Sequence, residues 1–382
     1  MSSRSPHRDT SPSSPGDDVV VGINYYAPHV SGLSITAQQV AESLVTAGYR
    51  VRVVCQRHNS DLPEHEIING VIVERVGVIA RIENGLISPS FPSRLRQRAR
   101  SAKLLHLHLP MLEAGIISLL VAATPTIVTY QCDFVATNPI LRSLVQRLVD
   151  KSSKVAIRRA ASTVVSSRDY ASHSRISSAL ETSIPIFPAV LNRRGGTAKF
   201  RVSTAPHFGF LGRIAPEKGL LELLEAFHLA AIPDSVLLIA GPIAESANKS
   251  FIQRVRDAAG KNPKVRILGS LPESDIPNFY ASIDAFVLPS TNRLEAFGIA
   301  QAEALLCDIP VIATDLPGVR TLVRQFGHGV VIPPSDVRAL SVALREVLGR
   351  TGTTRSNAAL GDGVKEYVEL IRRLLADVES PR

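Results

Sequence analysis

The sequence contains no tryptophan, and aromatic residues make up only 5% of its 382 residues. Its three cysteines, Cys55, Cys132 and Cys307, lie far apart and form no C-x-x-C pair, which argues against a disulfide framework or a zinc site of the usual spacing. No apolar run approaches the roughly 18 residues that a membrane-spanning helix needs. No secretory signal precedes Val19 either. We therefore expect a globular protein of a reducing compartment, the cytoplasm.

The net charge of +9 belongs almost entirely to residues 1–198. Nucleic acid is the first partner to consider for such a basic chain. However, the sequence lacks aromatic interleaving, zinc-finger spacing and a helix-turn-helix pattern, so we expect no nucleic-acid partner. An anionic membrane surface or an anionic acceptor fits the charge better.

Residues 289–318 are the most informative part of the chain. An apolar segment, residues 285–288, runs into a polar loop, and an alanine-rich apolar helix opens at Phe297-Gly298-Ile299 and ends near Cys307. A second buried strand, residues 311–313, stops at a Pro-Gly turn. This alternation predicts one βαβ unit of a parallel sheet.

Two glutamates, Glu295 and Glu303, bracket the predicted start of this helix. Helical side chains tilt toward the N-terminus, so both carboxylates could face one ligand at the mouth of the loop. The amides around Gly298 and Ile299 would favour a phosphate there. Two glutamates at this spacing are common on surface helices, and the preceding strand and the Phe-Gly-Ile sequence supply the specificity. A ligand with both hydroxyls and phosphates is a nucleotide sugar.

A second motif follows the predicted strand at residues 208–211, where Gly212-Arg213 leads to Glu217-Lys218-Gly219. An arginine guanidinium binds phosphate oxygens with two parallel hydrogen bonds, and a lysine adds a flexible point charge. Either cation alone would be an ordinary surface charge. Together, at the end of a strand, they predict a diphosphate-binding loop.

These motifs resemble the donor site of retaining glycosyltransferases of family 4, the glycosyl transferases group 1, which have the GT-B fold. In that family, Glu-Ala-Phe-Gly precedes an alanine-rich helix that carries the second glutamate. The resemblance implies an α/β protein of two doubly wound, Rossmann-like domains that face a central cleft. It places Glu303 on the ribose, Glu295 on the sugar, and Arg213 and Lys218 on the diphosphate. It also assigns donor contacts to the following residues: Gly32, Gly212, Leu271, Phe297, Gly298 and Ile299.

The resemblance and the breaks in periodicity divide the chain into five parts. We expect a disordered tail at 1–17, an N-terminal acceptor-binding domain at 18–190, a linker at 191–204, a C-terminal nucleotide-sugar-binding domain at 205–355, and a last helix at 356–382 that packs back on the N-terminal domain.

Candidate residues of the N-terminal domain follow its predicted strands. Gly32 precedes a helix, where close approach to a ligand and simple turn geometry are both explanations. His108 ends a His-x-His-x-Pro strand and is expected at the cleft, although a buried core histidine is an equal alternative. Relatives commonly have histidine at the position of Gln131, which cannot act as an acid or base, so Asp133 becomes the candidate for orienting an acceptor hydroxyl.

Residues 89–103 carry an unusual density of positive charge. The cations are Arg94, Arg96, Arg98, Arg100 and Lys103. Membrane-associated members of the family have a basic amphipathic helix in this region, which suggests attachment to anionic lipid. The apolar stripe of Phe91, Leu95 and Ala99 is thin, so a solvated basic helix face is the alternative.

The resemblance implies a retaining glycosyltransferase that uses a UDP-, GDP- or ADP-sugar and a lipid-linked or saccharide acceptor of the cell envelope. We expect no cofactor and no metal, because the sequence has no Asp-x-Asp motif. The expected location is the cytoplasm, with the inner face of the cell membrane as a peripheral site. A sugar-nucleotide epimerase on the same scaffold, and a nucleotide-sugar-binding subunit with weak or no turnover, remain as alternatives.

Overall fold

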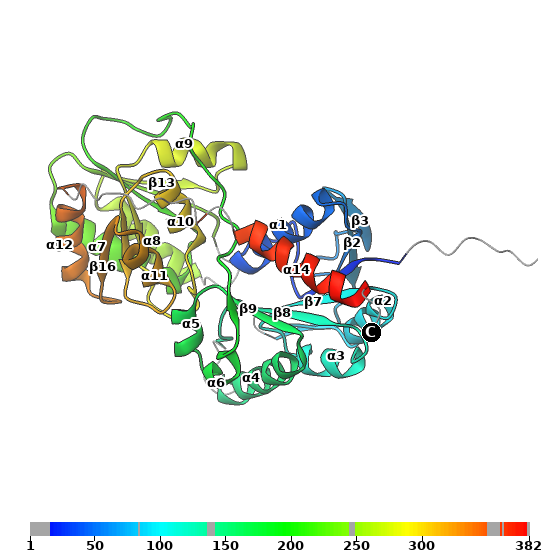
Figure 1. The fold of residues 1–382 in the computed structure, drawn as a ribbon. Coiled ribbons are helices and arrows are strands. Elements are labelled where there is room, and N and C mark those ends of the chain that lie inside the picture. The colour runs from blue at the N-terminus through cyan, green and yellow to red at the C-terminus, as the bar shows by residue number, and fades with distance from the viewer. Residues whose placement is uncertain are drawn as a thin grey trace, which may run out of the picture.

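The computed structural model describes residues 16–82, 85–135, 142–243, 249–349, 360 and 363–379. Its two α/β domains lie next to each other, each built on its own sheet (Figure 1). The predicted tail before Gly16 lies outside the described residues. Asp17, the last residue assigned to that tail, is buried and pairs with Arg52 at 2.6 Å, so the fold already includes it.

The N-terminal sheet has eight strands in the order β10-β9-β8-β7-β1-β2-β4-β3. The strands are β1 (Val19–Ile23), β2 (Val51–Gln56), β3 (His65–Ile68), β4 (Val71–Val76), β7 (Leu104–Leu109), β8 (Thr126–Tyr130), β9 (Ser162–Val165) and β10 (Ile184–Pro185). All neighbours pair in parallel except β3 and β4. Such a sheet is covered on both faces, which explains why β1 and β7 are buried along their whole length.

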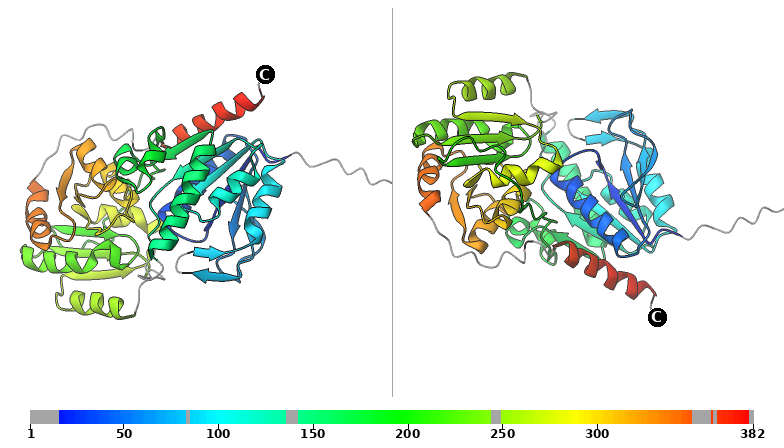
Figure 2. Two further views of the ribbon diagram at one scale, coloured as in Figure 1. Left: turned by 90° about the horizontal axis from the view of Figure 1, so that it is seen from below. Right: turned by 90° about the horizontal axis from the view of Figure 1, so that it is seen from above.

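Helices cover the two faces of this sheet (Figure 2). They are α1 (Gly32–Thr46), α2 (Ser90–Ala99), α3 (Ala114–Leu120), α4 (Arg142–Arg159), α5 (Arg168–His173) and α6 (Ser177–Leu180), and β5 (Ala80–Ile82) pairs with β6 (Gly85–Ile87) in a separate hairpin. β10 ends after two residues. Pro185 and Pro188 lack the N–H donors that a longer strand would need.

The C-terminal sheet has six parallel strands in the order β13-β12-β11-β14-β15-β16. The strands are β11 (His207–Leu211), β12 (Val236–Ala240), β13 (Val265–Gly269), β14 (Ala285–Leu288), β15 (Val311–Thr314) and β16 (Gly329–Ile332). The chain moves outward from β11 to β13 and then returns to β14 on the other side of β11. Ligands of open α/β sheets bind beyond the strand ends at such a reversal, between β11 and β14.

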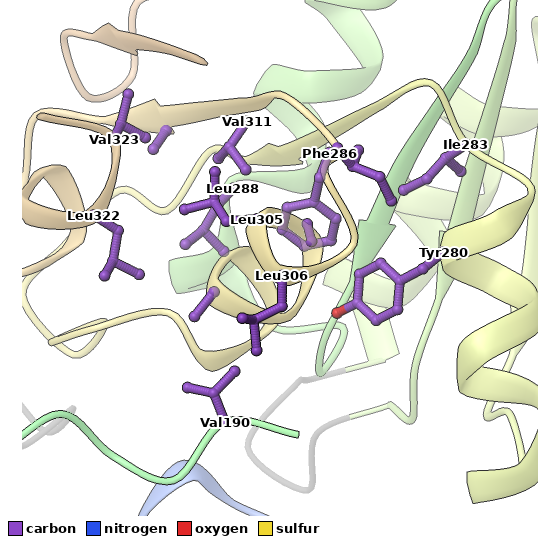
Figure 3. Close-up of a cluster of buried hydrophobic side chains, with 14 of the residues drawn as sticks. Val190, Tyr280, Ile283, Phe286, Leu288, Leu305, Leu306, Val311, Leu322 and Val323 are labelled. Atoms are coloured by element: carbon purple, nitrogen blue, oxygen red, sulfur yellow. The ribbon is translucent and has the colours of Figure 1, made fainter. Parts of the chain in front are cut away.

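The helical segments of this domain connect its strands. They are η1 (Pro216–Lys218), α7 (Leu220–Ala230), α8 (Lys249–Gly260), η2 (Glu273–Asp275), α9 (Ile276–Ala281), α10 (Ile299–Leu306), α11 (Val319–Phe326), α12 (Val337–Glu346) and η3 (Val347–Gly349). Leu305 and Leu306 of α10 belong to the same buried cluster as Phe286 and Val311 of the sheet (Figure 3). This packing fixes the start of α10 at the end of β14.

The last helix, α14 (Gly363–Glu379), packs on the N-terminal domain beside α1, as predicted (Figure 1). Tyr367 and Ile371 are buried in the cluster that contains Leu44 of α1. The Tyr367 hydroxyl lies 3.4 Å from the Thr129 hydroxyl. The C-terminal segment therefore completes the core of the first domain.

The linker predicted at 191–204 is bound to the C-terminal domain along its length. Its cations form the ion pairs Arg193–Glu303, Arg194–Asp308, Lys199–Asp275 and Arg201–Asp284. Gly196 approaches α9 so closely that a Cβ atom would lie 2.1 Å from the Pro277 carbonyl oxygen. The segment is a strap fixed to one domain, which its lack of periodicity did not indicate.

Candidate active site

Two of the predicted donor residues meet where β11 and β14 end. Lys218 lies in η1, after β11, and Glu295 lies in the loop after β14. The Lys218 ammonium forms an ion pair with the Glu295 carboxylate. Both side chains are largely buried, with 17% and 14% of their surface exposed. Since partial burial strengthens Coulomb attraction, the two charges attract each other more strongly than a fully exposed pair would.

The backbone around Gly219 brings this pair together. Gly219 has a φ of 69°, and a Cβ atom there would lie 2.0 Å from the Pro289 carbonyl oxygen. The Thr291 amide also donates to the Glu217 carbonyl at 2.9 Å. The loop after β11 therefore docks directly on the loop after β14, which only glycine permits here.

The other predicted phosphate ligand, Arg213, has a different partner. Its guanidinium lies 3.7 Å from the Glu217 carboxylate, and 42% of its side chain is exposed. The Gly212 amide before it donates to the Ala240 carbonyl at 3.0 Å. Arg213 thus lies on the same loop as Lys218 but pairs with Glu217 rather than with Glu295.

Glu303 is buried on α10 and already has two partners. Its Oε1 accepts a hydrogen bond from Arg193 Nε at 2.8 Å, and its Oε2 accepts one from the Tyr280 hydroxyl at 2.9 Å. Burial raises the pKa of Glu303, and the Arg193 charge opposes that shift without cancelling it. Arg193 also pairs with Glu273 at 2.5 Å. The sequence did not single out Arg193, which lies in the predicted linker, or Tyr280.

The start of α10 is formed by backbone rather than by side chains. Gly298 has a φ of 81°, and no side chain caps the helix there. Phe297 is buried with its ring centroid 5.4 Å from that of Phe187, so only its backbone could contact a ligand. A helix start without a capping side chain is suited to an anion.

Gly32 of the N-terminal domain faces the start of α10 across the domain boundary. A Cβ atom on Gly32 would lie 3.9 Å from Ile299 Cδ1, its nearest neighbour. Ser31 caps α1, with its hydroxyl accepting from the Ser34 amide at 3.2 Å. The starts of α1 and α10 are therefore neighbours, although sterics do not require glycine at Gly32.

Leu271 is partly buried beside Leu268 and packs against the core cluster of the C-terminal domain. Its predicted contact with the nucleotide base stays a prediction.

His108 is a buried histidine in a polar cluster. Its Nδ1 lies 3.3 Å from Gln131 Nε2, and its ring centroid is 4.2 Å from that of His106. Burial, together with His106, holds the pKa of His108 well below its usual range, so the imidazole is neutral. Gln131 also donates to the Leu33 carbonyl at 3.4 Å, which links the cluster to the start of α1.

Asp133 does not have the environment that its predicted role requires. Its carboxylate has no exposed surface and accepts hydrogen bonds from the Tyr130 hydroxyl (2.6 Å), the Ser174 hydroxyl (2.5 Å) and the Arg175 amide (3.2 Å). The fold itself uses this carboxylate to hold α5 and α6 against β8. The structure therefore gives no support to Asp133 as the residue that orients an acceptor.

Two protein-family models match the chain. The model described as "Glycosyl transferases group 1" matches residues 198–360, and the model described as "Glycosyl transferase 4-like domain" matches residues 31–178. The chain belongs to the glycosyl transferases group 1 family. It is a GT4-type glycosyltransferase, and the predicted fold class and enzyme class are confirmed.

Individual relatives and structures agree with this family. A phosphatidyl-myo-inositol mannosyltransferase of Mycobacterium leprae is 27% identical over 88% of this chain and 89% of its own. A GDP-mannose-dependent monoacylated alpha-(1-6)-phosphatidylinositol monomannoside mannosyltransferase of Corynebacterium glutamicum is 33% identical over 44% of this chain and 43% of its own. Among solved structures, Anabaena HepE in complex with UDP-glucose has a TM-score of 0.69 at 17% identity, covering 94% of this chain and 98% of its own. That similarity shows the GT-B fold.

The basic helix of this glycosyltransferase, α2, is not built for membrane insertion. Its apolar residues Phe91, Leu95 and Ala99 are fully buried in the core of the N-terminal domain. Arg94 and Arg98 each donate to the buried Glu74 carboxylate at 2.7 Å. The prediction that residues 89–103 attach to lipid through this apolar stripe is therefore wrong, because the stripe packs on the sheet. Of the helices that the structure describes, none is both long and apolar enough to cross a membrane.

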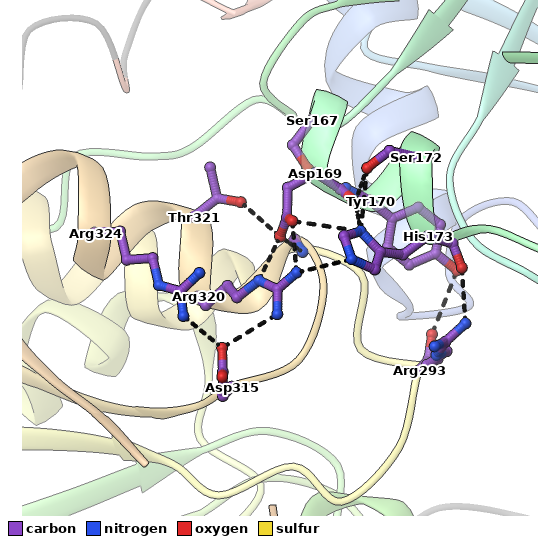
Figure 4. Close-up of polar contacts among 11 residues, drawn as sticks. Ser167, Asp169, Tyr170, Ser172, His173, Arg293, Asp315, Arg320, Thr321 and Arg324 are labelled. Carbon is purple, nitrogen blue, oxygen red and sulfur yellow. Dashed lines mark hydrogen bonds and ion pairs between the residues drawn. The ribbon is translucent and has the colours of Figure 1, made fainter. Parts of the chain in front are cut away.

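The two domains of the glycosyltransferase are joined by a charged contact that the sequence did not reveal. Asp169 of α5 accepts hydrogen bonds from the Gly318 amide at 2.8 Å and from Arg320 Nε and Nη2 at 2.9 and 2.7 Å (Figure 4). Arg293 of the C-terminal domain donates to the His173 carbonyl at 2.7 Å. Burial raises the pKa of Asp169, but the bonds from Arg320 and Gly318 outweigh burial and hold it below its ordinary value.

We predict that Asp169→Asn lowers the free energy of unfolding by about 1–3 kcal/mol and loosens the contact between the domains. Because the pKa of Asp169 is lowered in the folded chain, its contribution is complete above the ordinary value of 3.8 and is lost as the pH falls further. Thermal unfolding from neutral to acid pH should show a constant difference from wild type that shrinks only at the acid end. Small-angle scattering should show a larger radius of gyration for the variant.

Asp234→Asn is the matched control, because Asp234 is 85% exposed and pairs only with Lys264 at 3.3 Å among the described residues. If Asp169→Asn and Asp234→Asn were equally stable and equally compact, the Asp169 contact would not hold the domains together.

Proposed function

We propose that this glycosyltransferase transfers a sugar from a nucleoside-diphosphate sugar to an acceptor hydroxyl, with retention of anomeric configuration and without a metal ion. The Lys218–Glu295 pair between the ends of β11 and β14 carries the proposal. The names of the relatives support an acceptor of the cell envelope, since the proteins of M. leprae and C. glutamicum are both named as mannosyltransferases of phosphatidylinositol lipids. The name of the C. glutamicum protein makes GDP-mannose the first donor to test.

Donor binding would exchange the partners of the ion pair. In the structure, the Lys218 charge is neutralised by Glu295. A diphosphate would offer Lys218 a second anion, and the sugar hydroxyls would donate hydrogen bonds to Glu295. Cleavage of the sugar–phosphate bond builds up negative charge on the leaving diphosphate. A cation placed there stabilises the transition state more than the bound substrate.

The remaining groups suit the rest of the donor. Arg213 is exposed enough to turn from Glu217 to a phosphate. The α10 backbone at Gly298 offers amides to the same phosphates. Glu303 has bonds to Arg193 and Tyr280 on its two oxygens, and each oxygen keeps acceptor capacity for a ribose hydroxyl. Glu303 would thus bind the ribose as a carboxylate that the protein has already oriented.

The acceptor would enter from the N-terminal domain, opposite these groups. The neutral His108 and its partner Gln131 lie next to the start of α1, close to Gly32. A neutral imidazole can donate or accept a hydrogen bond, so His108 fits the positioning of a hydroxyl better than the transfer of a proton at neutral pH.

The direct test is an assay of UDP-, GDP- and ADP-sugars with and without a cell-envelope lipid extract, in buffer with EDTA. Release of nucleoside diphosphate that depends on the acceptor supports glycosyl transfer. A changed sugar nucleotide without an acceptor would indicate an epimerase, and donor binding without any product would indicate a binding subunit. The anomeric configuration of the product decides whether it is retained.

Lys218→Ala should lower kcat/KM about 10²-fold, because the transition state loses a cation beside the leaving group. Lys264→Ala is the matched control. Lys264 pairs with the exposed Asp234 at the amino edge of the sheet, opposite the carboxyl edge that carries this loop. Equal kcat/KM for the Lys218 variant and wild type would rule out the proposed role of Lys218.

Arg193→Gln should change how donor binding depends on pH. The variant loses the charge that opposes the raised pKa of Glu303, so this pKa should rise further and the carboxylate should be lost at a higher pH. We expect the acid limb of the donor KM profile to move to higher pH, with a smaller change in kcat. Arg194→Gln, which among the described residues loses side-chain bonds to Leu306 and Asp308 alone, should leave the acid limb in place. An unmoved acid limb in the Arg193 variant would contradict the proposed role of Glu303.

A further inference from the structure

Two neighbouring helices of the N-terminal domain, α3 and α4, present large apolar side chains to solvent. Those about half exposed are Leu112, Ile116, Leu119, Leu144 and Leu148. Ile116 and Leu119 of α3 are three residues apart, Leu144 and Leu148 of α4 are four apart, and Leu112 lies in the turn just before α3. Such spacing places each set on one face of its helix. Scattered exposed leucines are ordinary, but here five large apolar side chains are exposed on two adjacent helices and on the turn before one of them.

Hydrogen bonds hold α3 and α4 side by side, as both views also show (Figures 1 and 2). The Ser152 hydroxyl donates to the Leu112 carbonyl at 2.6 Å and accepts from the Gly115 amide at 2.8 Å. Farther along, Arg159 Nε donates to the Ser118 carbonyl at 3.3 Å. The two helices therefore lie in contact and run in the same direction.

The charges on this pair of helices are mostly positive. Arg147, Lys151 and Arg158 of α4 are exposed, whereas α3 carries no charged residue. Asp150 is the only acid in α4, and its carboxylate is held by Arg175 at 2.9 Å. Glu113, just before α3, accepts a hydrogen bond from Gln56 at 3.1 Å. The outward surface is thus apolar and basic.

The starts of both helices lie at the carboxyl edge of the N-terminal sheet, because α3 follows β7 and α4 follows β8. Ligands of such sheets bind along that edge. A surface attached through α3 and α4 would lie close to the entrance for the acceptor.

We propose that the α3–α4 face, formed by the five apolar residues together with Arg147 and Lys151, binds the surface of an anionic membrane. Apolar side chains among cations match lipid chains beneath anionic headgroups. A second copy of the same face would bring like charges together, which disfavours a homodimer through it. The inference goes beyond the proposed function, because it does not depend on which sugar is transferred. It assigns the membrane contact to α3 and α4 in place of α2.

The test is co-sedimentation of the full chain with vesicles of phosphatidylcholine alone and of phosphatidylcholine mixed with phosphatidylglycerol. We expect binding only to the mixed vesicles and weaker binding at high salt. Removing two cations with Arg147→Gln/Lys151→Gln should weaken binding about tenfold or more. The double variant Ile116→Ser/Leu148→Ser should weaken it similarly, through the loss of apolar burial.

Matched controls carry the same changes elsewhere. Arg254→Gln/Arg256→Gln on α8 and Leu229→Ser on α7 alter exposed residues of the C-terminal domain, and Arg100→Gln alters the end of α2. Each control should bind vesicles as wild type does. The proposal is overturned if wild type ignores anionic vesicles, if the α3–α4 variants bind as wild type, or if Arg100→Gln abolishes binding. A wild-type dimer that Ile116→Ser/Leu148→Ser converts to monomer would instead make this face a subunit interface.

Donor binding distinguishes this proposal from the function itself. Calorimetric titration with a nucleoside diphosphate should give the same Kd for wild type and for both α3–α4 variants. If the wild type bound no nucleoside diphosphate, this would count against the proposed function, whereas the vesicle result would still stand.

Discussion

Two carboxylates, the buried Glu303 and the largely buried Glu295, are each paired with a cation from a distant segment and organise the donor side of this glycosyltransferase. Lys218 is 77 positions from Glu295, and Arg193 is 110 positions from Glu303. An unpaired carboxylate in such surroundings would carry a large desolvation cost, so each glutamate needs a partner when no ligand is bound. The protein supplies cations for that purpose, and a sugar diphosphate could replace part of that pairing.

The sheet topology makes these pairings possible. Because the chain reverses between β11 and β14, the loops that carry Lys218 and Glu295 leave neighbouring strand ends. The strap then crosses the C-terminal domain and brings Arg193 to α10. On the opposite side, the Asp169 contact with Arg320 holds the N-terminal domain against α11. The contacts from Lys218, from the linker and from the N-terminal domain therefore all reach residues 295–320 of the second domain.

Local patterns in the sequence were sufficient for much of this fold. The βαβ unit was predicted because the alternation of apolar runs and a Pro-Gly turn is local, and the structure has β14, α10 and β15 there. The convergence of Lys218 on Glu295 followed from a motif at each strand end. Arg193 carried no such signal, since its role depends on where a segment without periodicity crosses the domain.

Burial was the other property that the sequence could not supply. Asp133 follows a strand as a ligand-binding residue would, but its carboxylate bonds to Tyr130 and Ser174, and Ser174 lies 41 positions away. The apolar side of α2 has the spacing of a membrane helix, and only the sheet beneath it shows that this side is occupied. In the same way, only the structure shows that the apolar residues of α3 and α4 are exposed.

The most direct measurement is a crystal structure of this chain with a bound nucleoside diphosphate. The account predicts phosphate oxygens within hydrogen-bond distance of Lys218 Nζ, ribose hydroxyls on the Glu303 carboxylate, and Arg193 still in contact with Glu303. A nucleotide bound elsewhere, or bound in this crevice with Lys218 and Glu303 turned away from it, would contradict the account.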